Sequence, residues 1–255
     1  MTRVPAQPPD PEVQVSSYLL RLSPAVVVDF GAGVIEAVGV SDLVEDPPAI
    51  RAAHQARADA LTRLSEALGD LPLHGAETLA QAAPESLDDL REAARGAEIV
   101  AEWHDEAGQV KAIAQMPLFE GPRSVLGVVT GLDQNLPFEE PAAPLPVVIV
   151  ELSGDQPLDY GLLPRLRLPG REAPILTQAW RPLARGVPPV SYAADLADAL
   201  GMLKQAQPSV VLAGRPDPGG GVDVLLANDS SARLQAAHLP PSYEAVDRVI
   251  LTLRP

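Results

Sequence analysis

The sequence predicts an α+β fold of two small domains, each a short β-sheet covered by helices on one side. Three observations predict it. Apolar residues recur at helical spacing over residues 47–68, and they alternate with a period of two over residues 99–116. A proline-rich stretch then separates this region from a second set of strand and helix patterns. We expect a proline-rich disordered tail and lead-in at 1–24, a first domain at 25–132, a linker at 133–146 and a second domain at 147–255.

The longest predicted helix runs from Pro47 to Leu68. Asp46 is a plausible N-cap, Gly69 is expected in the left-handed conformation that ends many helices, and Pro72 prevents continuation. The apolar stripe is rich in alanine, so the helix is expected to lie close against a sheet. The stripe consists of Ala53, Ala56, Ala60, Leu61, Leu64, Ala67 and Leu68.

The remaining elements of the first domain follow from shorter patterns. Residues 25–40 are expected to form one long or kinked strand, in which the glycines allow a bend or bulge. A second helix is predicted over Leu87–Ala94, with Ser86 as a possible cap and Gly96 as its stop.

A β-hairpin is predicted next, because the period changes from helical to two. Ile99, Ala101 and Trp103 are expected on one face of its first strand. The turn is Asp105–Gly108, with glycine where a positive φ is needed, and Pro117 ends the second strand. The shared face of that second strand is Val110, Ala112, Ala114 and Met116.

In the second domain, the uninterrupted apolar run Val147–Leu152 is typical of a central strand. A helix is expected over Tyr192–Gln205, with Tyr192 on its apolar face, and a short one over Asn228–Ala237. Further strands are expected at 163–168, 209–213, 222–226 and 248–253.

Composition excludes several classes of protein. The formal net charge is −15, with −12 in residues 1–135, and an acidic surface repels nucleic-acid backbones. No apolar run approaches the roughly 18 residues of a transmembrane helix. The absence of cysteine removes disulfides, thiolate metal sites and cysteine nucleophiles. No signal peptide is visible, so the protein is expected in the cytoplasm if Met1 is the true start.

The order of several short motifs resembles one bacterial family. The motifs are Arg57–Leu68, Leu73, Glu77–Leu79, Arg95–Glu102, Gly108–Lys111 and Met116–Leu118, followed by 163–166, 191–193, 208–211 and 222–228. They are similar to the twenty-kilodalton bacterial outer-membrane lipoprotein family, which shares its fold with the N-terminal part of flagellar assembly protein T, and to longer uncharacterised members. The resemblance implies a cell-envelope or periplasmic protein without catalytic residues, whose partners are envelope or assembly proteins. The chain departs from the family in showing neither a signal peptide nor a lipidation cysteine.

The motifs for cofactor and metal chemistry are incomplete. Gly31-x-Gly33 follows an apolar run, but Glu36 occupies the third glycine position of a dinucleotide fingerprint, so a bend in a strand is favoured. Gly219–Gly221 lacks the lysine of a phosphate loop. His104 beside Asp105 is more simply a solvated turn than a weak metal site. We therefore predict no cofactor, no metal and no catalytic residues.

One basic cluster is the candidate binding site. Arginines with a neighbouring tryptophan suit an anionic ligand, a glycan or an acidic protein surface, because guanidinium groups bind anions in pairs of hydrogen bonds. The alternative is an ordinary loop whose arginines pair with the acidic first domain. The candidate residues are Arg165, Arg167, Arg171, Trp180, Arg181 and Arg185.

The sequence thus favours a non-catalytic interaction or assembly module, associated with the bacterial cell envelope by resemblance. The alternative is a small-ligand or glycan-binding protein that uses the domain junction or the arginine-rich loop 165–185. Limited proteolysis is expected to cut within 133–146 and to release two resistant fragments.

Overall fold

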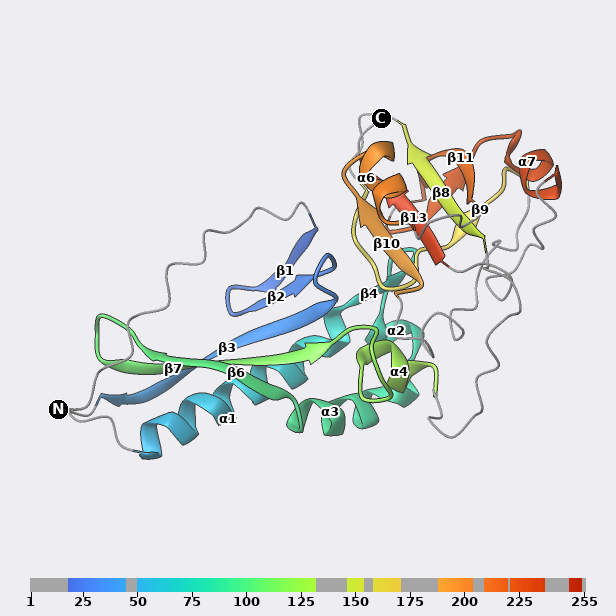
Figure 1. Ribbon diagram of the computed structural model, residues 1–255. Coiled ribbons are helices and arrows are strands. Elements are labelled where there is room, and N and C mark those ends of the chain that lie inside the picture. Colours follow the sequence, from blue (N-terminus) through green and yellow to red (C-terminus); the bar gives the residue numbers. More distant parts are fainter. Residues whose placement is uncertain are drawn as a thin grey trace.

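The computed structural model describes residues 18–44, 50–131, 146–153, 158–170, 188–203, 209–219, 221–236 and 248–253. Within these residues the chain forms a five-stranded sheet, a six-stranded sheet and a two-stranded hairpin, together with helices. The α+β fold predicted from the sequence is confirmed. Figure 1 shows the five-stranded sheet as a long arm with α1 beneath it and the six-stranded sheet at one end of the arm.

The first sheet is antiparallel and has the order β1-β2-β3-β7-β6. Its alternation of buried and half-buried residues has the expected period of two, because only one face is covered by a helix. The strands are β1 (Leu19–Ser23), β2 (Val26–Asp29), β3 (Val34–Val44), β6 (Glu98–His104) and β7 (Gln109–Pro117).

Helix α1 (Ile50–Ala67) crosses β3 and β7 and contributes small residues to the contact. A Cβ atom on Gly39 would lie 2.2 Å from the Ala56 carbonyl oxygen and 2.2 Å from the Ala60 nitrogen, so helix and strand touch through their backbones. The alanine-lined stripe is confirmed, with Ala53 and Leu61 only half-buried. The buried residues of α1 are Ala52, which the predicted stripe did not include, and Ala56, Ala60, Leu64 and Ala67.

Three predictions for this region are wrong in detail. Gly69 does not take the left-handed conformation, because α1 continues into the 3-10 turn Leu68–Asp70. Gly31 and Gly33 lie in a hairpin turn between two strands instead of a bend in one, with Gly33 at φ 70°. Residues 19–23, expected in the lead-in, form strand β1 of the sheet. Asp46 and Pro47 lie outside the described residues.

Short elements connect the arm to the second sheet. The hairpin β4 (Pro72–His74) and β5 (Glu77–Thr78) follows α1 and leads to helix α2 (Leu79–Ala82). Helix α3 (Leu87–Arg95) matches the second predicted helix, but Ser86 makes no side-chain cap hydrogen bond. Helix α4 (Val125–Val129) begins at Ser124, whose hydroxyl oxygen accepts a hydrogen bond from the Gly127 N–H.

The second sheet is mixed and has the order β10-β13-β8-β11-β12-β9. Strand β8 lies between two parallel neighbours and is almost wholly buried, as its apolar sequence predicts. Helix α6 (Leu196–Gly201) packs on one face and helix α7 (Ser230–Ala236) contacts β11. The strands are β8 (Val147–Leu152), β9 (Leu166–Arg167), β10 (Val190–Ala193), β11 (Ser209–Pro216), β12 (Val224–Leu226) and β13 (Arg248–Thr252).

The helix predicted from Tyr192 starts too early. Residues 190–193 form strand β10, which pairs with β13, and the helix begins only after Asp195 caps it. Tyr192 consequently lies in a strand and is buried. The predicted linker 133–146 lies outside the described residues, except for Pro146.

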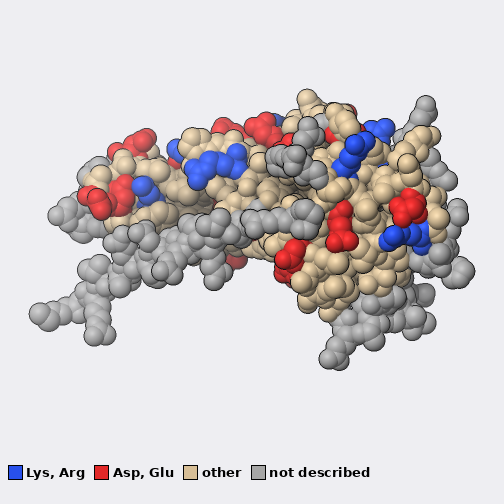
Figure 2. Space-filling view, turned by 90° about the horizontal axis from the view of Figure 1, so that it is seen from above, with Lys and Arg blue, Asp and Glu red and all other residues tan. Residues whose placement is uncertain are grey.

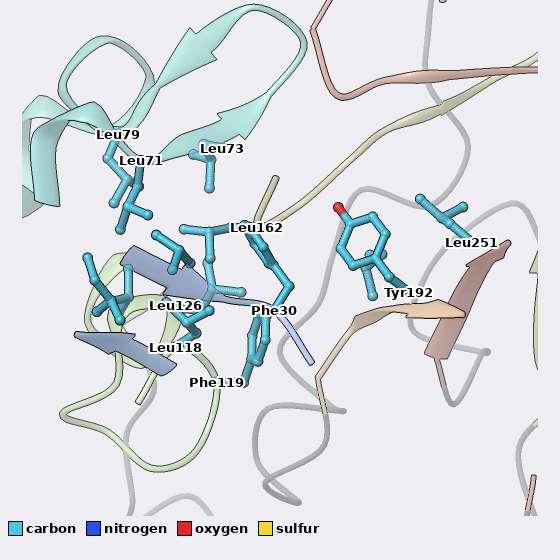
Figure 3. Close-up of a cluster of buried hydrophobic side chains, with 14 of the residues drawn as sticks. Phe30, Leu71, Leu73, Leu79, Leu118, Phe119, Leu126, Leu162, Tyr192 and Leu251 are labelled. Carbon is cyan, nitrogen blue, oxygen red and sulfur yellow. The ribbon is translucent and has the colours of Figure 1, made fainter. Parts of the chain in front are cut away.

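One buried hydrophobic cluster continues from the first sheet into the second. Figure 3 shows Phe30 and Leu162 between the leucines of the first part and Tyr192 of β10. The two sheets therefore share a core, and they are not joined by a peptide linker alone. If a protease cuts between them, the two fragments are expected to stay associated, in contrast to the release expected from the sequence.

Candidate functional site

The face of the first sheet opposite α1, which we call the open face, carries an apolar patch. Strand register places Val38, Ile113 and Ala101 in one row across β3, β7 and β6. Val40, Lys111 and Trp103 form the next row. The five apolar residues, Val38, Val40, Ala101, Trp103 and Ile113, are half-buried, whereas the α1 face of β3 and β7 is buried. We refer to these five residues as the apolar patch.

A β-bulge in β6 puts Trp103 in the patch. Ile99 pairs with Ala114 and Ala101 pairs with Ile113, so Val100 is the extra residue. The bulge reverses the alternation, which places Ile99 on the α1 face and Ala101 and Trp103 on the open face. The prediction that these three residues share a face is therefore wrong. Without the bulge, Trp103 would lie on the helix side of the sheet.

The helix side of the bulged strand is held by an ion pair. Glu102 accepts hydrogen bonds from the Arg57 guanidinium group of α1, one of them at 2.8 Å from Nη2 to Oε2. This hydrogen bonding lowers the pKa of Glu102 and raises that of Arg57. The pair fixes Glu102 toward α1, and with it the outward orientation of the neighbouring Trp103.

The hairpin tip beside the patch is also ordered by a carboxylate. Asp105 accepts backbone hydrogen bonds from Ala107 and Gln109, and its other oxygen lies 3.1 Å from Lys111 Nζ. The lysine hydrogen bond lowers the pKa of Asp105. Because Lys111 is drawn toward the tip, its ammonium group is paired while its aliphatic stem lies in register between Val40 and Trp103.

Two edges of the first sheet are protected in different ways against pairing with a further strand. Where β2 no longer covers β3, the Val40 N–H donates to the Asp59 carboxylate of α1 at 2.8 Å, which satisfies an edge donor. The β6 edge carries the bulge and the exposed Glu98 and His104, which are features that discourage strand addition. The open face, and not an edge, is therefore the better surface for a partner.

The junction, where the β4–β5 hairpin meets residues 161–165 and 221–223, is tightly bonded. Backbone N–H groups of Leu162 and Leu163 donate to the carbonyl groups of Pro72 and Leu73 at 3.0 and 2.8 Å. The Val222 N–H donates to the Gly75 carbonyl oxygen at 2.9 Å. These bonds tie the loop of the first part to the second sheet in the manner of a strand ladder.

Asp223 is the one buried charged residue in the described part of the chain, at 1% exposure. Its Oδ1 accepts from the Gly75 N–H at 2.7 Å and the Arg165 N–H at 3.0 Å. Its Oδ2 accepts from Arg165 Nε and Nη2, each at 2.8 Å. All of these donors are structural, so the carboxylate locks the junction and does not face a ligand.

Aromatic rings fill the adjoining part of the junction. Tyr192 stands at right angles to Tyr160 with ring centres 5.0 Å apart, and Phe30 lies 5.6 Å from Tyr192. The Tyr192 hydroxyl donates to the Gly161 carbonyl oxygen and accepts from the Gly161 N–H, both at 2.9 Å. Tyr18 donates to Asp198 at 3.3 Å, and burial followed by the Asp198 charge raises the pKa of Tyr18 to about 12.

The predicted arginine site is only partly within the described residues. Arg165 pairs with Asp223, and Arg167 Nη1 lies 3.1 Å from Asp217 Oδ2. Asp217 follows β11 and Asp223 precedes β12, so both carboxylates belong to the second sheet. Neither belongs to the acidic first domain, which was the alternative partner for these arginines. Ligand binding by the cluster stays a prediction, and four of its residues lie outside the described residues: Arg171, Trp180, Arg181 and Arg185.

Among the described residues, no three histidine or carboxylate side chains gather in a way that would hold a metal ion. In the same part of the chain, every helix is too short or too polar to cross a bilayer. His104 lies on the helix side of β6, opposite Val110.

The sequence reasoning missed both the patch and the junction. Val38 and Val40 were assigned to a strand but not to an open face, because nothing local shows on which side α1 packs. Asp223 follows Gly219–Gly221 in the sequence, and no local pattern predicts that it is buried. An available signal was Gly75, since a glycine in a short loop after Leu73 permits the close approach of another backbone.

Comparison with known proteins gives no relative for this chain. No family model matches it, and neither the curated proteins nor the solved structures contain a significant match. The resemblance to the twenty-kilodalton lipoprotein family therefore stays a prediction.

Proposed function

We propose that this protein is a non-catalytic interaction module that binds another polypeptide through the apolar patch. The carrying observation is that two adjacent rows of half-buried apolar residues, including a tryptophan, lie on a sheet face that no described helix covers. Tryptophan is among the residues that dominate binding energy at protein interfaces. Small-molecule sites are concave, whereas an open sheet face suits docking of another polypeptide.

The hydrogen bonds of the buried carboxylate Asp223 support the proposal that the protein is not an enzyme. A catalytic carboxylate needs an oxygen that faces substrate, whereas both oxygens of Asp223 accept hydrogen bonds from the protein itself. Association with the bacterial cell envelope is included in the proposal only on the strength of the motif order, and a test of location is separate from the test of the patch.

Site-specific photo-cross-linking in cells tests the proposal. A photoreactive amino acid at Val40 is expected to give a discrete cross-linked protein product, because Val40 lies in the patch. The matched control is the same amino acid at Ala58, an exposed position on the solvent side of α1. Identical products from the two positions, or no product from Val40, would reject the patch as a docking surface.

A further inference from the structure

The charges around the apolar patch indicate what kind of partner fits it. In residues 18–44 and 50–131 there are 16 acidic and 8 basic side chains. Five of the basic side chains are in ion pairs with acidic side chains of the same region: Arg57, Arg63, Arg91, Arg95 and Lys111. Outside these pairs, 11 acidic side chains stand against 3 basic ones. The unpaired charge of this part of the molecule is therefore mainly negative.

Acidic groups lie next to the patch itself. Glu36 occupies the neighbouring row of the open face, beside Val38 along β3. Glu106 stands at the hairpin tip after Trp103, beside Asp105, which is paired with Lys111. Figure 2, seen from above, shows acidic side chains at the end of the arm that points away from the second sheet, with basic side chains beside them. A partner that covers the patch must bring its own periphery close to these carboxylates.

A second copy of the chain does not meet this requirement. The whole chain has a formal charge of −15, so two copies repel each other, and face-to-face packing would bring like charges together around both patches. A partner with lysine or arginine around an apolar centre has the complementary charge.

The shape of the patch favours a helix. It spans three neighbouring strands, which is about 10 Å across, close to the diameter of an α-helix. On the opposite face, α1 already covers β3 and β7 with an apolar stripe. A second helix on the open face would complete a three-layer arrangement of helix, sheet and helix.

We infer, on the basis of the proposed function, that the apolar patch receives the apolar stripe of a basic amphipathic helix from another protein. Leucine-like side chains of the partner pack on Trp103, Ile113 and Val38. Its lysine or arginine side chains lie opposite Glu36 and the hairpin tip. Charge selects the partner and speeds its encounter, and apolar burial on the patch holds it.

The test uses two synthetic peptides and the full chain. Each fluorescein-labelled peptide has about 18 residues, or five helical turns, with leucine at positions i, i+3, i+4 and i+7. Lysine fills the other positions of one peptide and glutamate those of the other. Fluorescence anisotropy is measured with the unaltered chain, with the Trp103→Ser/Ile113→Ser variant, and with Leu200→Ser as control. Leu200 is an exposed leucine far from the patch in sequence, on α6.

The lysine peptide is expected to bind the unaltered chain and the Leu200→Ser chain at least about tenfold more tightly than the patch variant or the glutamate peptide. Its affinity should fall as salt rises from 0.05 to 0.5 M, because the Debye length shrinks below about 5 Å. Thermal melting of each variant shows that it is folded. The comparison of the two peptides on the unaltered chain depends on no variant.

The other outcomes separate the two proposals. Equal binding of both peptides, lost in the patch variant, overturns the charge preference and leaves the docking function supported. Equal binding of the lysine peptide to the unaltered chain and the patch variant overturns both, because the peptide then binds elsewhere. A dimer in sedimentation experiments that the patch variant abolishes makes a second copy the occupant and overturns the inference. Binding of neither peptide also overturns it.

Discussion

The two ends of the first sheet share strands β3 and β7 and the supporting helix α1, yet they differ in the contacts that surround them. At the junction end, Phe30 and the β4–β5 hairpin are built into the core of the second sheet. At the far end, the apolar patch is half-buried on the open face. The difference separates stability from binding: changes at the junction should weaken the fold, and changes in the patch should weaken only an interaction.

The largest loss of stability is expected from Leu64→Asp. Leu64 is fully buried under the sheet, and an aspartate there has no partner, so we expect a loss of more than about 4 kcal/mol and an unfolded arm. Circular dichroism melting measures it. Thr62→Asp, at an exposed position of α1, should melt close to the unaltered protein. Equal melting of the two variants would contradict the packing of α1.

Substitution of a single glycine should destabilise the junction end. Gly221 has φ 79°, and a Cβ there would lie 1.8 Å from the Gly75 carbonyl oxygen. Gly221→Ala should cost about 3 kcal/mol or more, measured by urea unfolding. Gly170 has φ 73° but no atom within 4 Å of a Cβ, so Gly170→Ala should cost only the left-handed penalty of about 1–2 kcal/mol. Equal losses would show that the close contact at the junction contributes nothing.

The next largest loss of stability is expected at alkaline pH, and it arises at the junction end. Burial raises the pKa of Tyr18 to about 12 and raises those of Tyr160 and Tyr192 above the ordinary value of 10.0. A raised pKa means that the folded state keeps the neutral phenol. Its stabilisation is complete below pH 10 and is lost as pH rises toward 12.

Urea midpoints at pH 9 and 11 measure this loss, and phenolate absorbance follows the titration. Tyr18→Phe removes one of the three groups, so its midpoint should fall less over the same range. A midpoint that is constant up to pH 11 would mean that these rings are not buried in the junction.

The smallest effect on stability is expected in the patch. Trp103→Ser should change the free energy of unfolding by less than about 1 kcal/mol, because Trp103 is half-buried and its side chain makes no hydrogen bond with the described residues. Urea unfolding checks it beside the photo-cross-linking experiment. A loss as large as that of Gly221→Ala would make Trp103 part of the core and would remove the contrast between the two ends.

Local patterns were enough to predict much of the arm. The alanine stripe of α1, the hairpin turn at Asp105–Gly108 and the alternation of β7 depend on neighbouring residues, and all three are confirmed. The bulge at Val100 was not predictable in the same way. Apolar alternation continues through Ile99, Ala101 and Trp103, and only the pairing with β7 shows that the face changes.

The second sheet was harder because its strands depend on distant partners. Tyr192 fits a helical stripe in the sequence, but pairing with β13, about 60 residues later, places it in a strand. The acceptor role of Asp223 likewise needs Gly75, 148 residues away. Of the predicted binding residues, Arg165 and Arg167 have carboxylate partners that no local pattern would identify.

The position of β13 has a consequence for biosynthesis. All five strands of the first sheet have been made once the ribosome passes Pro117, so that sheet can assemble early. Strand β8 must wait for Arg248–Thr252, which inserts between it and β10. Until then one edge of an apolar strand stays unpaired. A chain cut short before Arg248 should therefore be prone to aggregation, although its first sheet is intact.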